Sequence, residues 1–319
     1  MQQSPLQFRG SGDTVQTIEG LRLNNLCGQG NFSGVYWNDG SFQELSYVTG
    51  ADSAEMGQGG MRVNMVPKDG GNQFKGSIFG NWAGEQFTAN NLGNDLTGDL
   101  TYNPNNRLNN VGNIQKVWDL NPSIGGPILK DKIWFNYTFR SWGVYKYVAD
   151  SYFDSNPSPF VYTADTSRPG LDDGYIFSNV GRIAAQVTSK DKLSVYFDKQ
   201  QKYRNHWGIS ATIPPEAAGV QVTPSNYVGV GKWTRTQSSR LLLEGGFGVY
   251  NQNYTELYQE SVTGVAPTDF DLEAIRNARV YTVLDQSNGR IANAWNAPQT
   301  SFSTPVSYTH LTLPTSDLV

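Results

Sequence analysis

Hydrophobic and polar residues alternate with a period of two in several stretches of the chain. In Lys132–Gly143, apolar side chains occupy every second position from Ile133 to Phe139, and the positions between them are mostly polar. Such alternation predicts β-strands with one apolar and one polar face. The same pattern occurs in Tyr175–Thr188, Leu193–Gln200 and Leu241–Val249, whereas Tyr227–Arg235 is ambiguous because Val228 and Val230 alternate with Tyr227 and Trp233.

The connections between these segments differ in length in a regular way. Short polar turns at Leu129–Lys132, Ser189–Lys192 and Thr236–Ser239 join neighbouring strands. Long polar stretches, expected to be loops, separate the hairpins; they are Glu85–Gly112, Val144–Gly174 and Gln201–Asn226. Alternation alone fits half-buried strands of a soluble sheet equally well. Tight turns that alternate with loops longer than about 12–15 residues favour a transmembrane β-barrel instead.

The composition also indicates β-structure. Among 319 residues, 16% are charged and 38% hydrophobic, while 34 are glycine and 13% are aromatic. Aromatic residues favour strands, and glycine favours turns. Leu272–Arg279 is the only stretch that we expect to form a short helix. The predicted fold class is all-β, a partial transmembrane antiparallel barrel of about seven strands.

Several classes of protein are excluded by what the chain lacks. The net charge is −4 without a basic cluster, so no nucleic-acid partner is expected. Cys27 is the only cysteine, so the chain cannot form an internal disulfide. No apolar run is long enough for a transmembrane helix. The first residues do not resemble a signal peptide, which an exported barrel needs, so we expect the parent protein to extend upstream.

Catalytic and metal-binding patterns are also missing. His310 lies in a tail discussed below, which leaves His206 as the one histidine available for chemistry. No cysteine and histidine pair has zinc spacing, and no G-x-S-x-G elbow occurs. Gly28 and Gly30 suggest a nucleotide loop, but the spacing is wrong. We expect no enzyme activity, no cofactor and no metal site.

The sequence before the first alternating strand, Phe74–Trp82, has a different pattern. Met61–Val66 predicts a strand flanked by glycines and stopped by Pro67, and a turn at Asp69–Asn72 leads into the next strand. This passage resembles the plug-to-barrel junction of TonB-dependent outer-membrane receptors, most closely their Oar-like branch. The matching junction residues are Gly59, Gly60, Arg62, Asn64, Pro67, Lys68, Gly70, Gly71 and Asn72.

Other segments carry the same resemblance. Ile18-Glu19-Gly20 is similar to a plug turn that usually reads Asp-Gly, and Ser53–Gly57 is similar to a stretch that follows in the family. Asn121–Ile128 and Lys130–Phe135 are similar to the family's first periplasmic hairpin. Its matching residues are Gly125, Gly126, Pro127, Lys130, Asp131 and Lys132.

The resemblance implies a domain division and a function. Residues 1–72 would be the C-terminal part of a plug, and residues 73–305 the first strands of a barrel that in the family has about 22 strands. It further implies residence in the outer membrane of a Gram-negative bacterium, in contact with its lipid. A TonB-type energy-coupling complex would drive import of a siderophore, glycan or peptide. The TonB box, most of the plug and roughly two thirds of the barrel are expected to lie outside this chain. Residues 306–319 resemble a translated sequencing adaptor and are set aside as an artefact, with a genuine C-terminal strand as the alternative.

Two alternatives to import remain open. A surface protein with the same architecture could mediate adhesion or organise the envelope, and a secreted β-sandwich could bind carbohydrate. Arg62 and Lys68 could pair plug with barrel, or be solvated. Lumen-facing Arg140, Arg182 and Asp198 could meet the plug or a substrate, or hydrate the interior. Trp134, Trp142 and Trp233 would suit the aromatic girdles at the membrane surfaces, or lie in a core.

Overall fold

The chain folds almost entirely into β-strands. The computed structural model describes residues 14–23, 35–49, 60–87, 112–156, 161–252, 254–264, 282–287, 289–292, 300–301 and 306–312. These residues form a four-stranded sheet, a ten-stranded sheet and a two-stranded hairpin. The predicted all-β fold class is confirmed. The predicted helix Leu272–Arg279 lies outside the described residues.

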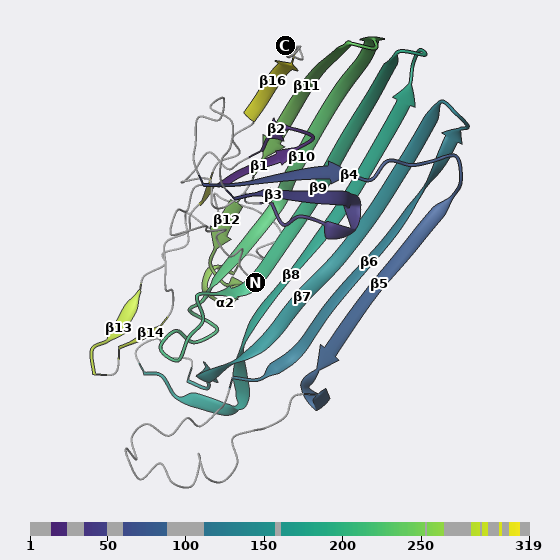
Figure 1. Cartoon of the computed structure of the whole chain (residues 1–319). Helices are drawn as coiled ribbons and strands as arrows, with labels where there is room; N and C mark the ends of the chain where they lie inside the picture. The colour runs from purple at the N-terminus through teal and green to yellow at the C-terminus, as the bar shows by residue number, and fades with distance from the viewer. Residues whose placement is uncertain are drawn as a thin grey trace.

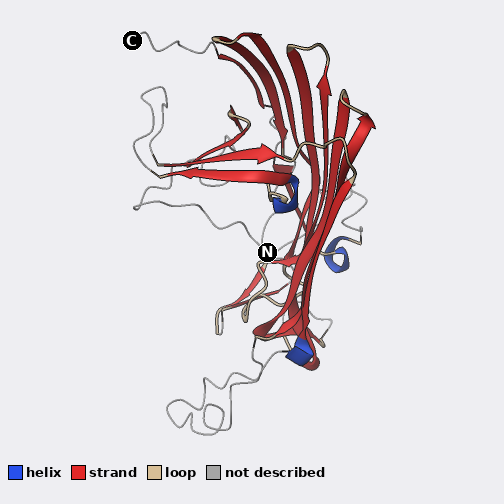
Figure 2. Cartoon of the chain, turned by 45° about the vertical axis from the view of Figure 1, so that its right-hand side comes forward, coloured by secondary structure: helices blue, strands red, loops and turns tan. Residues whose placement is uncertain are grey.

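The larger sheet, here called the barrel sheet, is built on seven consecutive strands (Figure 1). Each strand pairs antiparallel with the next. Figure 2 shows that the sheet curves around one side, as part of a barrel wall does. Within the described residues the sheet does not close, because β5 pairs only with β6. The strands are β5 (Lys75–Gly84), β6 (Ile114–Leu129), β7 (Ile133–Asp154), β8 (Ala164–Gln186), β9 (Asp191–Trp207), β10 (Gly219–Ser238) and β11 (Leu241–Asn251).

Shorter elements complete the described residues. They are β12 (Tyr254–Leu257), the single-turn helix α2 (Glu260–Thr263), the hairpin β13 (Val283–Asp285) and β14 (Arg290–Ala292), β15 (Thr300–Ser301) and β16 (Val306–Thr312). Strand β16 pairs with the outer edge of β11. The segment set aside in the sequence analysis therefore forms an edge strand here. An unpaired edge offers hydrogen-bonding groups to any extended segment, so this pairing leaves the origin of residues 306–319 a prediction.

The tight turns lie close to their predicted places, but two predicted long loops are wrong. Strands β7 and β8 have 22 and 23 residues and remain paired up to Asp154 and Ala164, so Val144–Gly174 is mostly strand. Strands β9 and β10 likewise extend into Gln201–Asn226. At about 3.3 Å per residue a 22-residue strand is roughly 70 Å long, more than twice the hydrocarbon thickness. Strand segments that continue past a bilayer would have no lipid-facing side to keep apolar, so the alternation that identifies strands would end there. The third turn lies at Ser239 and Arg240, slightly later than predicted.

The two faces of the barrel sheet differ as the alternation predicts. On the convex face Val195 is 58% and Ile183 50% exposed. On the concave face Thr138, Ser178 and Asp198 are buried. The smaller sheet explains the ambiguous sequence pattern of β10. Val228 and Val230 face inward and are buried beneath that sheet.

The aromatic girdle prediction is partly corrected. Trp134 and Trp142 share the inward side of β7 with Arg140, so they cannot face lipid. Trp233 pairs in register with Leu193 of the convex face. Four other aromatic residues form one row across the convex face, here called the aromatic row. Trp82 lies opposite Trp118 and Tyr175 opposite Tyr203, and Gly143 lies between the two pairs.

The smaller sheet, here called the inner sheet, lies on the concave face (Figures 1 and 2). Its strands are β1 (Thr14–Ile18), β2 (Leu21–Arg22), β3 (Phe42–Val48) and β4 (Met61–Pro67), in the order β2-β1-β4-β3. Strands β1 and β4 are parallel and the other pairs antiparallel. Two single-turn 3-10 helices, η1 (Asp39–Ser41) and η2 (Glu85–Phe87), flank β3 and β5. None of the helices in the described residues is long and apolar enough to span a membrane.

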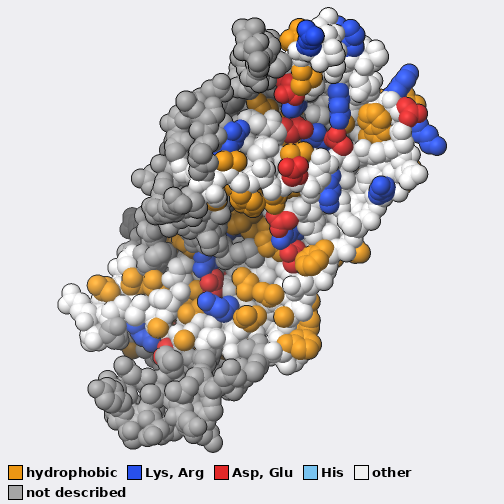
Figure 3. Space-filling view, in the orientation of Figure 1, with side chains coloured by type: hydrophobic (Ala, Val, Ile, Leu, Met, Phe, Trp, Pro, Cys, Tyr) orange, Lys and Arg blue, Asp and Glu red, His pale blue; other side chains and the backbone are white. Residues whose placement is uncertain are grey.

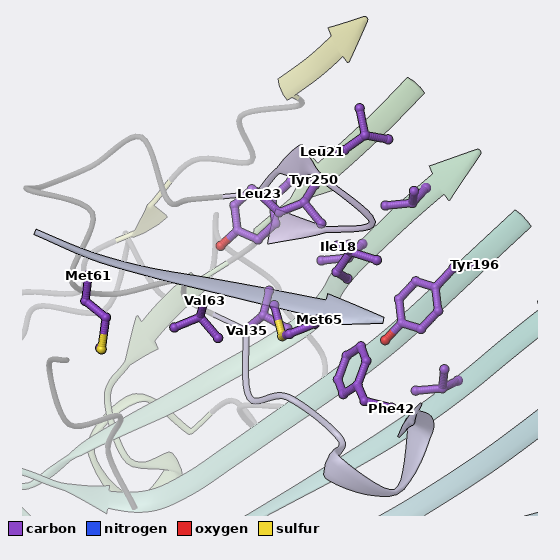
Figure 4. Packing of buried hydrophobic residues seen from close by; sticks show 13 residues of the cluster. Ile18, Leu21, Leu23, Val35, Phe42, Met61, Val63, Met65, Tyr196 and Tyr250 are labelled. Carbon is purple, nitrogen blue, oxygen red and sulfur yellow. The ribbon is translucent and has the colours of Figure 1, made fainter. Parts of the chain in front are cut away.

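The core of the molecule lies between the two sheets (Figure 4). Ile18 and Met65 of the inner sheet belong to the same buried cluster as Val228 and Tyr250 of the barrel sheet. Phe42 stacks on Tyr196 with ring centroids 6.0 Å apart. The inner sheet thus buries its apolar side chains against the barrel wall, and four short strands have little other core.

Glycines of β11 allow this close approach. A Cβ atom at Gly246 would lie 2.8 Å from a methyl carbon of Leu21, and one at Gly248 would lie 3.4 Å from Leu23. The inward positions of β11 are therefore small where the inner sheet carries leucine. Shape complementarity places the inner sheet at one position on the wall.

Candidate functional site at the contact between the two sheets

A cluster of four charged residues joins the inner sheet to the wall. Arg182 of β8 is only 5% exposed, and its Nη2 lies 2.7 Å from Oε1 of Glu19, which follows β1. The Nε of Arg182 donates to Oδ1 of Asp69 at 2.5 Å, and Nζ of Lys192 donates to Oδ2 of Asp69 at 2.6 Å. In Figure 3, basic and acidic side chains lie interspersed over this part of the concave face.

The partners of Asp69 control its ionisation. Burial opposes the charged form, but the hydrogen bond from Lys192 and the charge of Arg182 outweigh burial, and the pKa of Asp69 lies below its ordinary value of 3.8. Asp69 is therefore ionised at neutral pH. A buried arginine held by two carboxylates is costly to leave unpaired, so this cluster resists separation of the sheets.

A second charged contact lies further along the wall. Arg140 of β7 donates to both carboxylate oxygens of Asp119 on β6, at 3.0 and 2.8 Å. Its remaining nitrogen donates to Asp39 and to the carbonyl oxygen of Trp37, each at 3.1 Å. The Asp39 side chain is 68% exposed, so its ion pair contributes little. Asp119 orients the guanidinium, and the inner sheet receives the hydrogen bonds that remain.

Uncharged hydrogen bonds hold the segment of residues 35–41, here called the latch. Gln200 of β9 accepts a hydrogen bond from the backbone nitrogen of Tyr36 at 2.8 Å and donates to its carbonyl oxygen at 2.7 Å. The same amide nitrogen also donates to Asp198 at 2.7 Å, which fixes the orientation of the amide. Asn38 donates to Ser178 and accepts from Asn121. Four wall strands therefore bind one short segment mostly through neutral groups.

The two predicted motifs meet at the tight-turn end of the wall. Oδ1 of Asn72 accepts hydrogen bonds from the backbone nitrogen of Asp131 at 2.9 Å and from Nε1 of Trp134 at 2.7 Å. Its Nδ2 donates to Oδ1 of Asp131 at 2.5 Å. Asp131 has a positive φ of 61° in the first turn, a conformation that Asp tolerates and that these bonds stabilise. The junction and the first hairpin thus form one contact.

Gly70 of the junction lies so close to the backbone of β7 that only glycine fits there. A Cβ atom at Gly70 would lie 2.3 Å from the carbonyl oxygen of Phe135 and 2.9 Å from its nitrogen. Nothing lies within 4 Å of a Cβ at Gly71, so the two adjacent glycines have different environments. The junction chain therefore lies directly on the backbone of β7 at Gly70.

The other predicted residues have varied positions. Asn64 of β4 stays within the inner sheet, where its Oδ1 accepts from Oγ1 of Thr17 and the nitrogen of Gly20. Lys68 makes no ion pair with a described residue. Gly60 precedes β4, Arg62 lies on it and Pro67 ends it; Gly125, Gly126 and Pro127 lie on β6, Lys130 and Lys132 lie exposed in the first turn, and Gly59 lies outside the described residues.

Sequence reasoning named Arg140 and Arg182 as residues that could meet the inner sheet, and the structure brings both to it. It missed Glu19 as an ion-pair partner, although the Glu19-Gly20 turn was noted. It also missed Asn38 and Gln200, which no motif marks. Among the described residues, no group of three potential ligands could hold a metal ion.

The geometry defines a class of protein: a barrel wall with a second, smaller sheet bound in its lumen. No family model matches the chain. The TonB-dependent transporter Oar of Myxococcus xanthus is 36% identical over 100 residues, a match that covers 29% of this chain and 8% of that protein. This relative supports the resemblance to TonB-dependent receptors that the junction motifs carry.

A solved structure gives a more distant comparison. The crystal structure of the siderophore receptor PirA from Acinetobacter baumannii has a TM-score of 0.48 and 11% identity to this chain. The likeness covers 97% of this chain and 38% of that receptor, so the chain spans well under half of its length.

Proposed function

We propose that the chain supplies plug and wall to an outer-membrane transporter that imports a bulky nutrient with energy from a TonB-type complex. Residues 1–72 would belong to the plug and residues 73–305 to the wall. The observation that carries the proposal is the inner sheet bound in the lumen by hydrogen bonds and ion pairs that surround a shared apolar cluster. Water can replace the polar contacts at a net cost of about 1 kcal/mol each, so this part of the contact can be released and restored.

The dimensions of the convex face support residence in a membrane. Leu193, beside a tight turn, and Tyr203, in the aromatic row, are ten residues apart on β9. At about 3.3 Å per residue and a tilt of about 40°, this segment spans roughly 25 Å, the height of the apolar band of an outer-membrane barrel. In this orientation the tight turns face the periplasm and the longer connections face the exterior.

The nutrient would be a siderophore, a glycan or a peptide, the classes that the resemblance implies. The contacts on the wall favour none of them, because the inward polar groups named above bind the inner sheet. The proposal is therefore import of a ligand too large for free diffusion. The relative from Myxococcus xanthus is a transporter, in keeping with a protein that is not an enzyme.

A reversible tether between the sheets tests the proposal. An ideal Cβ at Gly246 lies 3.3 Å from Cγ of Leu21, so cysteines at these two positions place a sulfur near disulfide distance of the opposing Cβ. Leu21→Cys with Gly246→Cys, in a Cys27→Ser background, should cross-link the inner sheet to β11. In cells carrying a full-length receptor with this sequence, the oxidised form should import no ligand and a reductant should restore import.

The control and the refuting result are both specific. Gly246→Cys alone, in the same background, should import equally well under oxidising and reducing conditions. If the fully cross-linked double variant imports ligand as fast as its reduced, uncross-linked form, a transport role that requires release of the inner sheet is refuted. Failure of the protein to fractionate with outer membranes would refute the location.

A further inference from the structure

We propose that a cavity at the junction binds one small oxyanion, a phosphate or a carboxylate group. The cavity has a volume of about 270 Å³ and lies between the junction segment and the first three wall strands. Residues 68–71 and Gln73 form one side, β5 and β6 form another, and Asn136 of β7 completes it. At roughly 30 Å³ per water molecule, the space holds about nine waters. It is smaller than the pockets of about 300–1,000 Å³ that enclose drug-sized ligands, so it suits a single small group.

The cavity is lined by hydrogen-bond donors that are not used within the described structure. Lys68 and Lys75 both line it, and neither ammonium group makes an ion pair or a side-chain hydrogen bond with a described residue. Each brings a positive charge and three donors. Lysine binds phosphate and carboxylate groups as a compact point charge.

Asn136 supplies a buried neutral donor. The residue is 9% exposed, and its Oδ1 accepts a hydrogen bond from Oγ1 of Thr138 at 3.3 Å. No hydrogen bond joins its amide nitrogen to another described residue. A Cβ at Gly125 would lie 2.8 Å from this nitrogen, so the glycine leaves space in which the amide can lie. This nitrogen can therefore donate to an acceptor in the cavity, which an oxyanion provides.

The single acid in the lining does not oppose an anion strongly. Asp69 accepts hydrogen bonds from Arg182 on one oxygen and from Lys192 on the other. Two cations therefore compensate its charge from outside the cavity, since neither lines it. The local balance at the cavity is positive, because Arg182 and Lys192 already compensate Asp69 and the lining adds Lys68 and Lys75.

Titration with inorganic phosphate tests the site. The full chain, refolded in detergent, is titrated by calorimetry at constant ionic strength, with sodium acetate in a second series as the carboxylate probe. Lys68→Gln and Lys75→Gln should each weaken binding about ten-fold or more, as expected for the loss of a charged hydrogen bond. Lys130→Gln is the matched control, because Lys130 is exposed in the first turn outside the lining and should leave affinity unchanged.

A second variant separates binding from folding. Asn136→Asp keeps the shape of the side chain but replaces the donor with a negative charge, so it should abolish binding. A far-ultraviolet circular dichroism spectrum like that of the parent chain would show that the barrel sheet is intact. Saturable binding of either ion that depends on the two lysines supports the site. Absence of saturable binding of both ions below about 10 mM, or an affinity in both lysine variants equal to that of the parent chain, overturns it. The outcome does not depend on transport, because no import is measured.

Discussion

Removal of Arg182 should release the inner sheet from the wall. The substitution Arg182→Met keeps much of the aliphatic side chain and removes the guanidinium that bonds Glu19 and Asp69. Glu19 would lose its cation in a site where its side chain is 12% exposed. Asp69 would keep Lys192, and its greater exposure further reduces the loss.

The size of the effect follows from this asymmetry. An uncompensated buried charge costs about 3–5 kcal/mol when its partner is removed. We assign most of this cost to Glu19 and little to Asp69, which gives about 3 kcal/mol in the free energy of docking. At about 1.4 kcal/mol per factor of ten, the undocked fraction should rise roughly 100-fold.

Hydrogen–deuterium exchange of β4 is a direct assay in the detergent-refolded chain. Ile18 and Met65 are buried against the wall, so the inner sheet cannot keep its core once it undocks. Exchange of the backbone amides of Met61–Pro67 therefore reports undocking, and its rate should rise about as much as the undocked fraction.

A matched control removes an equally close ion pair from the wall alone. Arg204 on β9 donates to both oxygens of Asp172 on β8, at 2.8 Å each. Neither residue bonds the inner sheet through this pair, so Arg204→Met should leave exchange in β4 close to that of the parent chain. Unchanged exchange of β4 in Arg182→Met would refute the anchoring role. An equal increase in both variants would show general destabilisation instead.

Three further predictions concern the junction, pH and lipid. Gly70→Ala should destabilise docking by about 1–3 kcal/mol, because its Cβ meets the backbone of Phe135, whereas Gly71→Ala should be neutral; β4 exchange measures both. The contribution of Asp69 to docking should be complete above about pH 4 and disappear as the pH falls through its lowered pKa, which exchange measured across pH detects. Val195→Lys should cost about 2–4 kcal/mol of barrel stability in bilayers if its convex position faces lipid, and denaturant titration in vesicles would show no loss if it does not.

Alternation in the sequence was enough to predict the wall where one face is apolar. Phe197 and Leu193 mark the convex face, and the turns Leu129–Lys132 and Ser189–Lys192 end strands as expected. Where strands continue with polar residues on both faces, pairing depends on partners such as Asp172 and Arg204, and no periodic signal remains. The strand lengths were therefore underestimated.

The site was harder to predict because its residues pair across long separations in the sequence. Position on the polar face of a strand identified Arg140 and Arg182, but not their partners. Glu19 precedes Arg182 by 163 residues, and Tyr36 precedes Gln200 by 164. A single sequence contains no record of which distant residues meet. Val228 was ambiguous for the same reason, because an inward apolar residue makes sense only once the inner sheet covers it.

The sequence separations of these contacts also indicate the order in which they can form as the chain is completed. Asn72 and Asp131 are 59 residues apart, and a chain complete through β7 already contains both. Asp69 is 113 residues from Arg182 and 123 from Lys192, so its two cations arrive only with β8 and β9. Closing a long chain segment costs entropy before its contacts can form. The inner sheet is thus tethered early at the first turn and fixed late, so an incomplete wall leaves it unsecured.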